Sequence, residues 1–382
     1  MPKIKILHCA DIHIGAELAS IGNKARQRKE EILMTFDKIV SICKDENIQV
    51  LLIAGDLFQS SNMDEAVVSS VKNSLRNIPE TIVAIAPGNH DYISIDSPFS
   101  DEDWPGNVHI FKSKFEAVEF KELGLRLWGA AFTSTYVTNP MLNLVEVSKD
   151  DMINIGVIHG ELISENQTSN YNPISVAQIR NSSMDYVALG HIHKASEVLK
   201  AGNTYYAYCG CPEGQGFDEL DEKGVYVGTI TKGKCDLEFR PICKRMNVEL
   251  HVDISGVNTN NEVAERVVKT IKIKYGEGYA KNLYKVILEG DIDANFKVDC
   301  EAAAIRLESE VYFIKLRDET HIEIDINSLA KEASLKGIFV QKMLDKINKN
   351  IDSGNDILVD QYRKALYIGL KAFEGEVGYN ED

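Results

Sequence analysis

The sequence lacks a CxxC cysteine pair and long apolar runs, and each absence excludes a class of protein. Seven cysteines are scattered over 382 residues without a CxxC pair, which argues against a structural zinc site and against a disulfide framework. No apolar run approaches the ~20 residues that a membrane span requires. The N-terminal stretch MPKIKILHCADIH has no secretory signal pattern. We therefore expect a cytoplasmic protein without a membrane-spanning segment.

The sequence also lacks an excess of positive charge. Its net charge of −16 argues against a protein that binds nucleic acid by bulk electrostatic attraction. Local phosphate binding stays open, because bound divalent cations supply positive charge that a count of side chains omits. There is no internal repeat and no low-complexity tract, so the length predicts more than one globular domain.

Short apolar runs that alternate with helical patterns predict an α/β fold. Runs rich in Ile, Val and Leu predict strands at 3–8, 50–53, 81–86, 125–130, 153–158, 185–189 and 204–208. Apolar residues at helical spacing predict helices over 32–43 and 67–75, between the first three strands. This order implies right-handed crossovers and a largely parallel sheet. The later strands have no clear helices between them, which indicates a second sheet packed against the first.

The character of the sequence changes near residues 240–246, which marks a domain boundary. Strand patterns at 248–254, 283–288 and 311–316, with helical patterns near 262–274 and 299–307, predict a small α/β unit. Two amphipathic helical patterns follow at 335–347 and 358–373. We predict domains over residues 1–244 and 245–330, then C-terminal helices over 331–382, which either pack on their own domain or bind a partner.

Five predicted strands run directly into polar residues of the kinds that bind metals. These residues are Asp11 and His13, then Asp56, then Asn89, His90 and Asp91, then His159, and finally His191 and His193. Parallel strands deliver their carboxyl ends to one edge of a sheet, where ligands generally bind, so we expect the five clusters to meet in space. Glycine beside several of them fits tight turns at the strand ends.

The donors are oxygens and imidazole nitrogens without thiolates, and they are too many for one ion. Two aspartates, one asparagine and four histidines suit manganese, iron, zinc or magnesium, and the histidine content disfavours magnesium alone. One carboxylate that bridges two ions about 3.5–4 Å apart would use the whole set. We expect two divalent metal ions, with Mn²⁺ as the first candidate and Fe²⁺, Zn²⁺ or Mg²⁺ as alternatives.

The motifs D-x-H, G-D, G-N-H-D, H and G-H-x-H occur here in the order typical of the calcineurin-like metallophosphoesterase superfamily, which the chain resembles. The resemblance implies a two-sheet α/β/β/α sandwich. It also implies two ligand sets that share Asp56 as a bridge: Asp11, His13, Asp56 and His193 for one ion, and Asp56, Asn89, His159 and His191 for the other.

The chain is similar in particular to DNA repair exonucleases of the SbcD type, through segments 7–15, 55–58 and 208–225. In that family a small capping domain follows the catalytic one, and we expect residues 245–330 to be that domain. One departure is Gly210-Cys211-Pro212, where the family more often has Gly-Ser-Pro. We expect this change to leave the metal chemistry unaffected.

The adjacency of Asn89, His90 and Asp91 suggests a proton donor. We expect His90 to protonate the leaving oxygen of a phosphodiester, since it lies beside a ligand without being needed as one. Asp91 is expected to orient His90 and to favour its protonated form. The ions would lower the pKa of a bridging water and clamp the phosphate oxygens. The predicted enzyme is a metal-dependent phosphodiesterase.

The resemblance implies DNA as the substrate, an SMC-like coiled-coil ATPase bound through the C-terminal helices, and a homodimer formed through the catalytic domain. Basic residues at 266, 269, 272, 274, 281 and 285 are candidate contacts with DNA phosphates, although a solvated helix face is the commoner explanation. Two alternatives stay open. One is an esterase for small phosphodiesters such as cyclic nucleotides, which would not need the unit after residue 240. The other is a non-catalytic protein that only docks the ATPase, which the intact ligand set argues against.

Overall fold

The computed structural model describes residues 2–142, 147, 150–293, 295–322 and 326–373. The last nine residues of the predicted C-terminal segment, 374–382, lie outside this range. The chain divides into two compact units. The first unit combines Met1–Val252, Ala264–Ile287 and Cys300–Arg317, and the second combines Asp253–Val263, Leu288–Asp299 and Asp318–Asp382.

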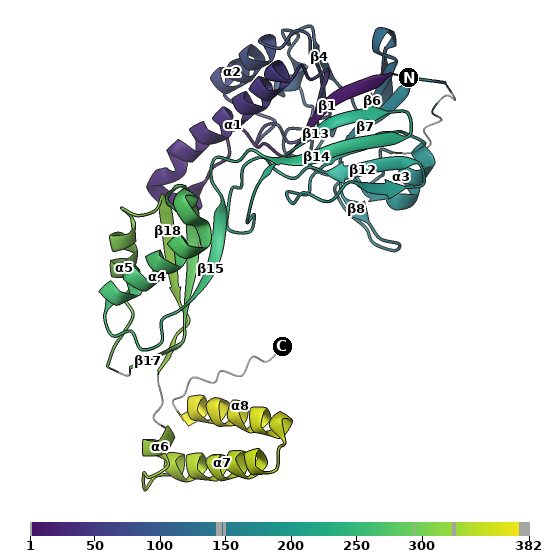
Figure 1. Ribbon diagram of the computed structural model, residues 1–382. Helices are drawn as coiled ribbons and strands as arrows, with labels where there is room; N and C mark the ends of the chain where they lie inside the picture. The colour runs from purple at the N-terminus through teal and green to yellow at the C-terminus, as the bar shows by residue number, and fades with distance from the viewer. Residues whose placement is uncertain (1, 143–146, 148–149, 294, 323–325, 374–382) are drawn as a thin grey trace. The chain divides into compact units, whose positions relative to one another are not determined.

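The first sheet contains the N-terminal parallel strands, in the order β14-β13-β1-β2-β3-β4. The strands from β1 to β4 are parallel neighbours, whereas β13 pairs antiparallel with β1 on its other side and β14 pairs antiparallel with β13. The helices α1 (Ala25–Asp45) and α2 (Glu65–Arg76) connect β1 to β2 and β2 to β3 (Figure 1). The strands are β1 (Lys3–Cys9), β2 (Val50–Ile53), β3 (Ile82–Ile85), β4 (Val108–Ile110), β13 (Gly224–Thr231) and β14 (Lys234–Pro241).

The second sheet has the order β11-β12-β10-β7-β6-β5. Its four central strands are parallel, and each edge strand pairs antiparallel with its neighbour. The helix α3 (Val176–Ser182) precedes β10 and begins with a capping box between Ser175 and Gln178. The strands are β5 (Glu116–Phe120), β6 (Leu125–Gly129), β7 (Ile153–His159), β10 (Tyr186–Gly190), β11 (Leu199–Ala201) and β12 (Thr204–Tyr208).

The two sheets pack face to face, and helices cover their outer faces. Alternate residues of β1 separate the layers. Ile4 and Ile6 enter the core between the sheets, while Leu7 and Cys9 enter the core shared with α1 and α2. On the outer face of the second sheet, α3 packs against β10 and β12. This α/β/β/α sandwich confirms the predicted fold class.

A buried hydrogen-bonded histidine joins the two sheets just before the polar clusters begin. His8 of β1 is fully buried. Its Nε2 lies 3.2 Å from the carbonyl oxygen of Leu189 and its Nδ1 lies 2.9 Å from the Tyr186 hydroxyl, both in β10. Because the carbonyl only accepts, Nε2 donates to it and Nδ1 accepts from the hydroxyl. His8 thus has a structural role, and its two hydrogen bonds hold β1 next to β10.

The elements predicted between residues 248 and 316 are present. A three-stranded sheet has the order β15-β16-β18, and two helices lie in its connections. These elements are β15 (Asn247–Asp253), α4 (Asn260–Tyr275), β16 (Leu283–Glu289), α5 (Cys300–Leu307) and β18 (Phe313–Asp318). Two short strand pairs complete the sheets: β8 (Leu162–Ile163) with β9 (Ile174–Ser175), and β17 (Asp291–Ile292) with β19 (His321–Ile322).

Both predicted C-terminal helices are confirmed. The segment contains α6 (Ile326–Leu329), α7 (Leu335–Asp352) and α8 (Asp356–Phe373). Val340 and Ile347 of α7 form one buried cluster with Leu366 and Leu370 of α8, so the two helices bury their apolar faces against each other. Within the described range, no helix combines the length and the apolar character needed to cross a bilayer.

Candidate metal centre

The predicted metal ligands all lie at the carboxyl ends of parallel strands. Three of these strands belong to the first sheet and two to the second. Asp11 and His13 follow β1, Asp56 follows β2, Asn89 follows β3, His159 ends β7, and His191 and His193 follow β10. Four of these residues have positive φ angles: 51° for Asp11, 51° for His13, 50° for Asp56 and 106° for His191. Positive φ angles are uncommon for residues other than glycine, and they tend to cluster at functional sites. These angles therefore point to this strand edge as the site.

Asp11, His13 and His193 form the first group of donors. The Nε2 atoms of His13 and His193 lie 3.1 Å apart, and the ligand atoms of all three residues lie within 4.8 Å of one another. The Nδ1 atom of His13 is buried and has no hydrogen-bond partner. The Asp11 carboxylate is fixed by the backbone N–H of His191, which donates to it at 3.0 Å.

Asn89, His159 and His191 form the second group. The Asn89 side-chain oxygen lies 2.9 Å from Nε2 of His159 and 3.2 Å from Nδ1 of His191. On its other edge, the His159 ring donates from Nδ1 to the carbonyl oxygen of Ala54 at 2.9 Å. Since that carbonyl can only accept, the neutral ring carries its proton on Nδ1. The lone pair of Nε2 then points into the site, as a metal ligand requires.

Asp56 lies between the two groups. Its Oδ2 is 3.7 Å from Nε2 of His13 and 3.4 Å from Nε2 of His159, and its Oδ1 accepts from the backbone N–H of His90 at 2.9 Å. Gly88 makes room for this carboxylate, because a Cβ at that position would collide with it. The position of Asp56 is the one that a carboxylate shared by two ions would occupy.

The buried carboxylates of Asp11 and Asp56 lie close together, so this site favours the binding of positive charge. Burial raises the pKa of Asp11 to about 6. Burial also opposes the charged form of Asp56, but the neighbouring His159 outweighs it and holds the pKa of Asp56 below its usual range. In return, Asp56 and Asp11 overcome the burial of His159 and raise its pKa to about 9. A divalent cation would replace the proton that His159 otherwise takes up.

The arrangement fits divalent cations. A binuclear centre requires a ring with its lone pair aimed inward and a carboxylate between two donor groups, and His159 and Asp56 provide them. The donors are oxygen and imidazole nitrogen, which suit Mn²⁺, Fe²⁺ or Zn²⁺. The identity of the ion does not follow from these donors.

His90 lies at the exposed rim of this centre. Its ring meets the His13 ring edge-on, with centroids 4.8 Å apart. Its Nδ1 lies 3.3 Å from the backbone carbonyl oxygen of Gln59. When Nδ1 is protonated it donates to that oxygen, so Gln59 is the residue that orients His90.

The expected contact between Asp91 and the His90 ring does not form. Asp91 is fully buried, and its two oxygens accept from the backbone N–H groups of Gly88 at 2.7 Å and Phe58 at 3.1 Å. Adjacent side chains in this turn point in opposite directions, so Asp91 anchors the turn while His90 faces outward. The predicted orienting role of Asp91 is therefore corrected to a structural one.

Two contacts of the metal ligands were not predicted from the sequence. Glu219 forms a short hydrogen bond with Nδ1 of His193, which leaves Nε2 free to face the centre. The Tyr171 ring lies against His191, with centroids 4.8 Å apart. Glu219 falls in the segment 208–225 that resembles the exonucleases, but nothing in its local pattern marks it. Tyr171 lies in a loop without any motif.

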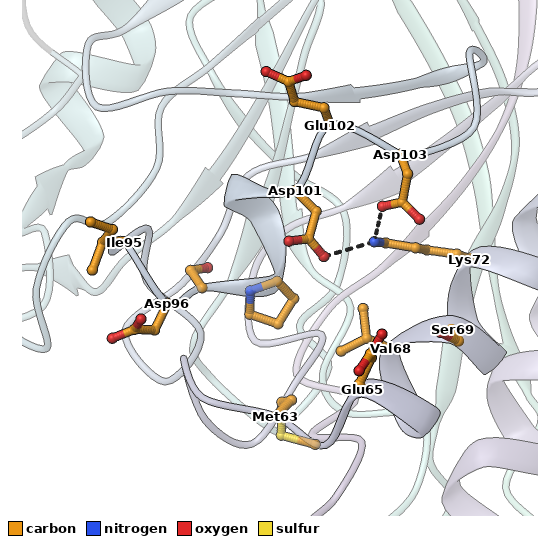
Figure 2. Close-up of a pocket in the computed structure, with 12 residues that line it drawn as sticks. Met63, Glu65, Val68, Ser69, Lys72, Ile95, Asp96, Asp101, Glu102 and Asp103 are labelled. Atoms are coloured by element: carbon orange, nitrogen blue, oxygen red, sulfur yellow. Dashed lines mark hydrogen bonds and ion pairs between the residues drawn. The ribbon is translucent and has the colours of Figure 1, made fainter.

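A pocket of about 510 Å³ lies apart from this cluster, between α2 and the segment 95–103 (Figure 2). Carboxylates dominate its lining: Glu65, Asp96, Asp101, Glu102 and Asp103. The Lys72 ammonium group pairs with Asp101 at 2.8 Å and also with Asp103. This cation is already neutralised, and none of the predicted metal ligands lines the pocket.

A two-sheet sandwich that gathers aspartate, asparagine and histidine at its strand ends defines a metal-dependent phosphoesterase. The family model of the calcineurin-like phosphoesterases matches residues 4–195, which include every predicted metal ligand. The chain belongs to the calcineurin-like phosphoesterase family. The predicted enzyme class is confirmed at the level of this family.

Similarity to individual proteins is more distant. The uncharacterized metallophosphoesterase YhaO of Bacillus subtilis is 27% identical over 62% of this chain and 60% of its own length. The SbcD component of the nuclease SbcCD from the same organism is 25% identical over 56% of this chain and 63% of its own length. The DNA double-strand break repair protein Mre11 of Methanopyrus kandleri is 24% identical over 94% of this chain and 81% of its own length. The chain thus spans less than two thirds of the two Bacillus relatives.

Proposed function

We propose that this chain is a dinuclear-metal-dependent phosphodiesterase that hydrolyses DNA phosphodiester bonds. The observation that carries the proposal is the Asp56 carboxylate, which lies 3.7 Å from His13 and 3.4 Å from His159 and so stands between two donor groups. Asp11, His13, Asp56 and His193 would hold one ion, and Asp56, Asn89, His159 and His191 would hold the other. When bound, the ions supply a hydroxide nucleophile at neutral pH and positive charge for the phosphate oxygens.

His90 is the proposed proton donor to the leaving oxygen. It is exposed at the rim of the centre, so substrate can reach it. The Gln59 carbonyl oxygen, 3.3 Å from Nδ1, holds the ring and leaves Nε2 free to donate. Asp91 supports the same turn from below through its bonds to Gly88 and Phe58. The catalytic machinery thus falls within residues 1–244, as the proposed division of the chain requires.

DNA is the proposed substrate because of the relatives. The SbcD component of nuclease SbcCD and the repair protein Mre11 both match this chain, and the second match covers 94% of it. That coverage takes in most of the small α/β part at 245–330, which a small-ester hydrolase would not need.

The second candidate substrate is a small phosphodiester, and two observations favour it. The net charge of −16 offers little attraction for a polyanion. Two of the lysines expected to contact DNA are already paired: Lys272 with Glu310 at 2.8 Å, and Lys285 with Glu249 at 2.6 Å. The two substrates are separated by the experiment below.

The proposed partner is an SMC-like coiled-coil ATPase that binds the C-terminal helices at 331–382. Ile357 and Ile368 of α8 are 75% and 62% exposed, and eleven residues make about three helical turns, so they share one face. The ion pair between Asp360 and Lys364, at 3.1 Å, lies between them on this face, so two separate apolar side chains are the candidate contacts with a coiled coil. In co-purification with the ATPase, Ile357→Lys with Ile368→Lys should abolish binding. Ile351→Lys, at a 50% exposed position of α7, serves as the control. Unchanged binding by the double variant would place the partner elsewhere.

The proposed activity is tested by incubating the purified chain with Mn²⁺ and end-labelled duplex, single-stranded and hairpin DNA, alongside bis-p-nitrophenyl phosphate. Cleavage of both DNA and the small ester is expected. Cleavage of the small ester alone would overturn the DNA assignment and leave the metal assignment standing.

The control for the metal centre is Asp56→Asn, which keeps the shape of the side chain and removes the shared charge. This variant should lose activity on every substrate and should bind fewer than two Mn²⁺ ions per chain. Two bound ions with normal turnover in this variant would mean that Asp56 is not the bridge.

A further inference from the structure

The Nδ1 edge of the His193 ring faces a second set of donors, distinct from those of the candidate metal centre. Glu219 contacts Nδ1 through one carboxylate oxygen. The Cys211 thiol lies 3.6 Å from its other oxygen. The ligand atoms of His193, Cys211 and Glu219 all lie within 4.8 Å of one another.

This set is accessible from one side and firmly held. His193 and Glu219 have side-chain exposures of 30% and 11%, and both line a pocket of about 560 Å³. Cys211 is buried behind them. The surrounding backbone is fixed, because Gln215 donates from its N–H to Glu219 at 2.7 Å and Lys223 donates from Nζ to the carbonyl oxygen of His193 at 3.2 Å.

This set includes a thiol, which the candidate catalytic centre lacks, and a thiol favours a different metal ion. A thiolate, an imidazole nitrogen and a carboxylate oxygen are ligands of tetrahedral Zn²⁺, with water as the fourth. Thiolate ligands favour zinc and softer ions such as cadmium over Mn²⁺ and Mg²⁺. The predicted catalytic ligands include no thiolate, so the two places differ in metal preference.

We propose that His193, Cys211 and Glu219 form a third, inhibitory cation site that takes Zn²⁺ or another thiophilic divalent ion. The ion binds Nδ1 of His193 in place of its proton, and the Cys211 thiol also releases its proton to solvent. Glu219 turns from a hydrogen-bond acceptor into a metal ligand. His193 then loses the contact that aims Nε2 at the catalytic centre, so occupancy lowers phosphodiesterase activity. The inference rests on the proposed function only for this last effect.

Two readouts test the site in the full chain loaded with Mn²⁺. The first is the ultraviolet charge-transfer absorption of cadmium bound to thiolate, followed during titration with Cd²⁺. The second is inhibition of bis-p-nitrophenyl phosphate hydrolysis by Zn²⁺. In Cys211→Ser, the absorption of one thiolate-bound cadmium per chain should disappear. The zinc concentration for half inhibition should rise by on the order of tenfold or more, while the activity without zinc is retained.

Cys209→Ser is the matched control. Cys209 is also fully buried and lies two residues away, but its thiol contacts the carbonyl oxygen of Gly210 at 3.3 Å and does not belong to the donor set. It should bind cadmium and respond to zinc as the unmodified chain does. Glu219→Gln keeps the thiol and removes the carboxylate, and it should weaken cadmium binding.

Equal cadmium absorption and equal zinc inhibition in Cys211→Ser and in the unmodified chain would overturn the proposal, because zinc would then act at the catalytic ligands. Failure of the proposed function has a different signature. The Mn²⁺-loaded chain would hydrolyse no phosphodiester, while the cadmium titration would still report on His193, Cys211 and Glu219.

Discussion

At the scale of single residues, His90 separates proton donation from metal binding. His90→Ala removes an exposed ring that contacts Gln59 and the edge of the His13 ring. Turnover of a phosphodiester should fall by about 10²–10⁴-fold, the usual contribution of a general acid. The number of Mn²⁺ ions bound per chain, measured by elemental analysis, should stay the same. Near-normal turnover would remove His90 from the mechanism.

Asp91→Asn provides the comparison for this prediction. Asp91 accepts two backbone N–H bonds, from Gly88 and Phe58, and an amide can accept only through its one oxygen. This variant should lose thermal stability as well as turnover, whereas His90→Ala should unfold at the same temperature as the unmodified chain.

The candidate ligands could be located residue by residue because each follows a strand that is visible in the sequence, and the structure brings them together. Their supporting contacts could not be located in this way. Glu219 reaches His193 across 26 positions of sequence, and no spacing rule covers such a contact. The role expected for Asp91 was wrong for a related reason: adjacency in sequence does not fix the direction of a side chain. The role of Asp91 follows from the hydrogen bonds that its carboxylate accepts from the backbone N–H groups of Gly88 and Phe58.

At the scale of elements, the stabilisation that the His8 hydrogen bonds give between the two sheets should depend on pH. Burial lowers the pKa of His8 to about 3, whereas its ordinary value is 6.5. Between these values the unfolded chain binds a proton that the folded chain does not. The contribution of neutral His8 is therefore complete above about pH 6.5 and is lost as pH falls toward 3, by about 1.4 kcal/mol per unit.

His8→Gln tests this dependence in metal-free protein, by denaturant unfolding at several pH values. The variant should be less stable than the unmodified chain at pH 8, and the difference should shrink as the pH is lowered. A difference for His8→Gln that does not change with pH would mean that His8 is not buried in its neutral form.

A buried ion network ties α1 to the chain that leaves the first domain. Glu31, 1% exposed, accepts from Arg28 at 2.9 Å and from Arg245 at 2.7 Å. These bonds outweigh burial, which favours the neutral acid, and lower the pKa of Glu31 to about 2. Glu31→Ala should cost about 1.5–3 kcal/mol of unfolding free energy, because Arg28 and Arg245 each lose a charge-assisted hydrogen bond. Arg28 keeps its ion pair with Glu213 at 2.9 Å, so its charge does not become unpaired.

The neighbouring Glu30 is a matched control for that change. Its side chain is 59% exposed and lies 3.5 Å from Arg26, so Glu30→Ala should alter the unfolding free energy by no more than about 0.5 kcal/mol. Equal effects of the two substitutions, measured by denaturant unfolding, would show that the network does not stabilise the fold.

The central elements were predictable, whereas the edge strands β4, β5 and β11 and the short helix α3 were not. The central strands appear in the sequence as apolar runs because both of their faces are buried. The hairpin of β13 and β14 was not predicted. β14 is an edge strand with alternate residues exposed, and the pairing of β13 with β1 joins residues more than 200 positions apart. Such long-range pairing leaves no local pattern.

At the scale of the whole molecule, charge decides how a polyanion could bind. The chain has 42 Lys and Arg against 58 Asp and Glu, and Lys272 and Lys285 form ion pairs with Glu310 and Glu249. Under the proposed function, the positive charge for a phosphate would then come largely from the ions proposed to bind around Asp56. DNA binding and metal binding are therefore expected to be coupled.

Binding of duplex DNA, measured by fluorescence anisotropy, should accordingly be weak in chelator and strengthen by on the order of tenfold or more when the two ions are bound. The plot of log affinity against log salt should be shallow, since each phosphate contacted by Lys or Arg contributes only about −0.9 to its slope. Asp56→Asn should lose the gain from metal. A steep slope that persists in chelator would instead require an extended basic surface, and DNA would then be held by side chains rather than through the ions.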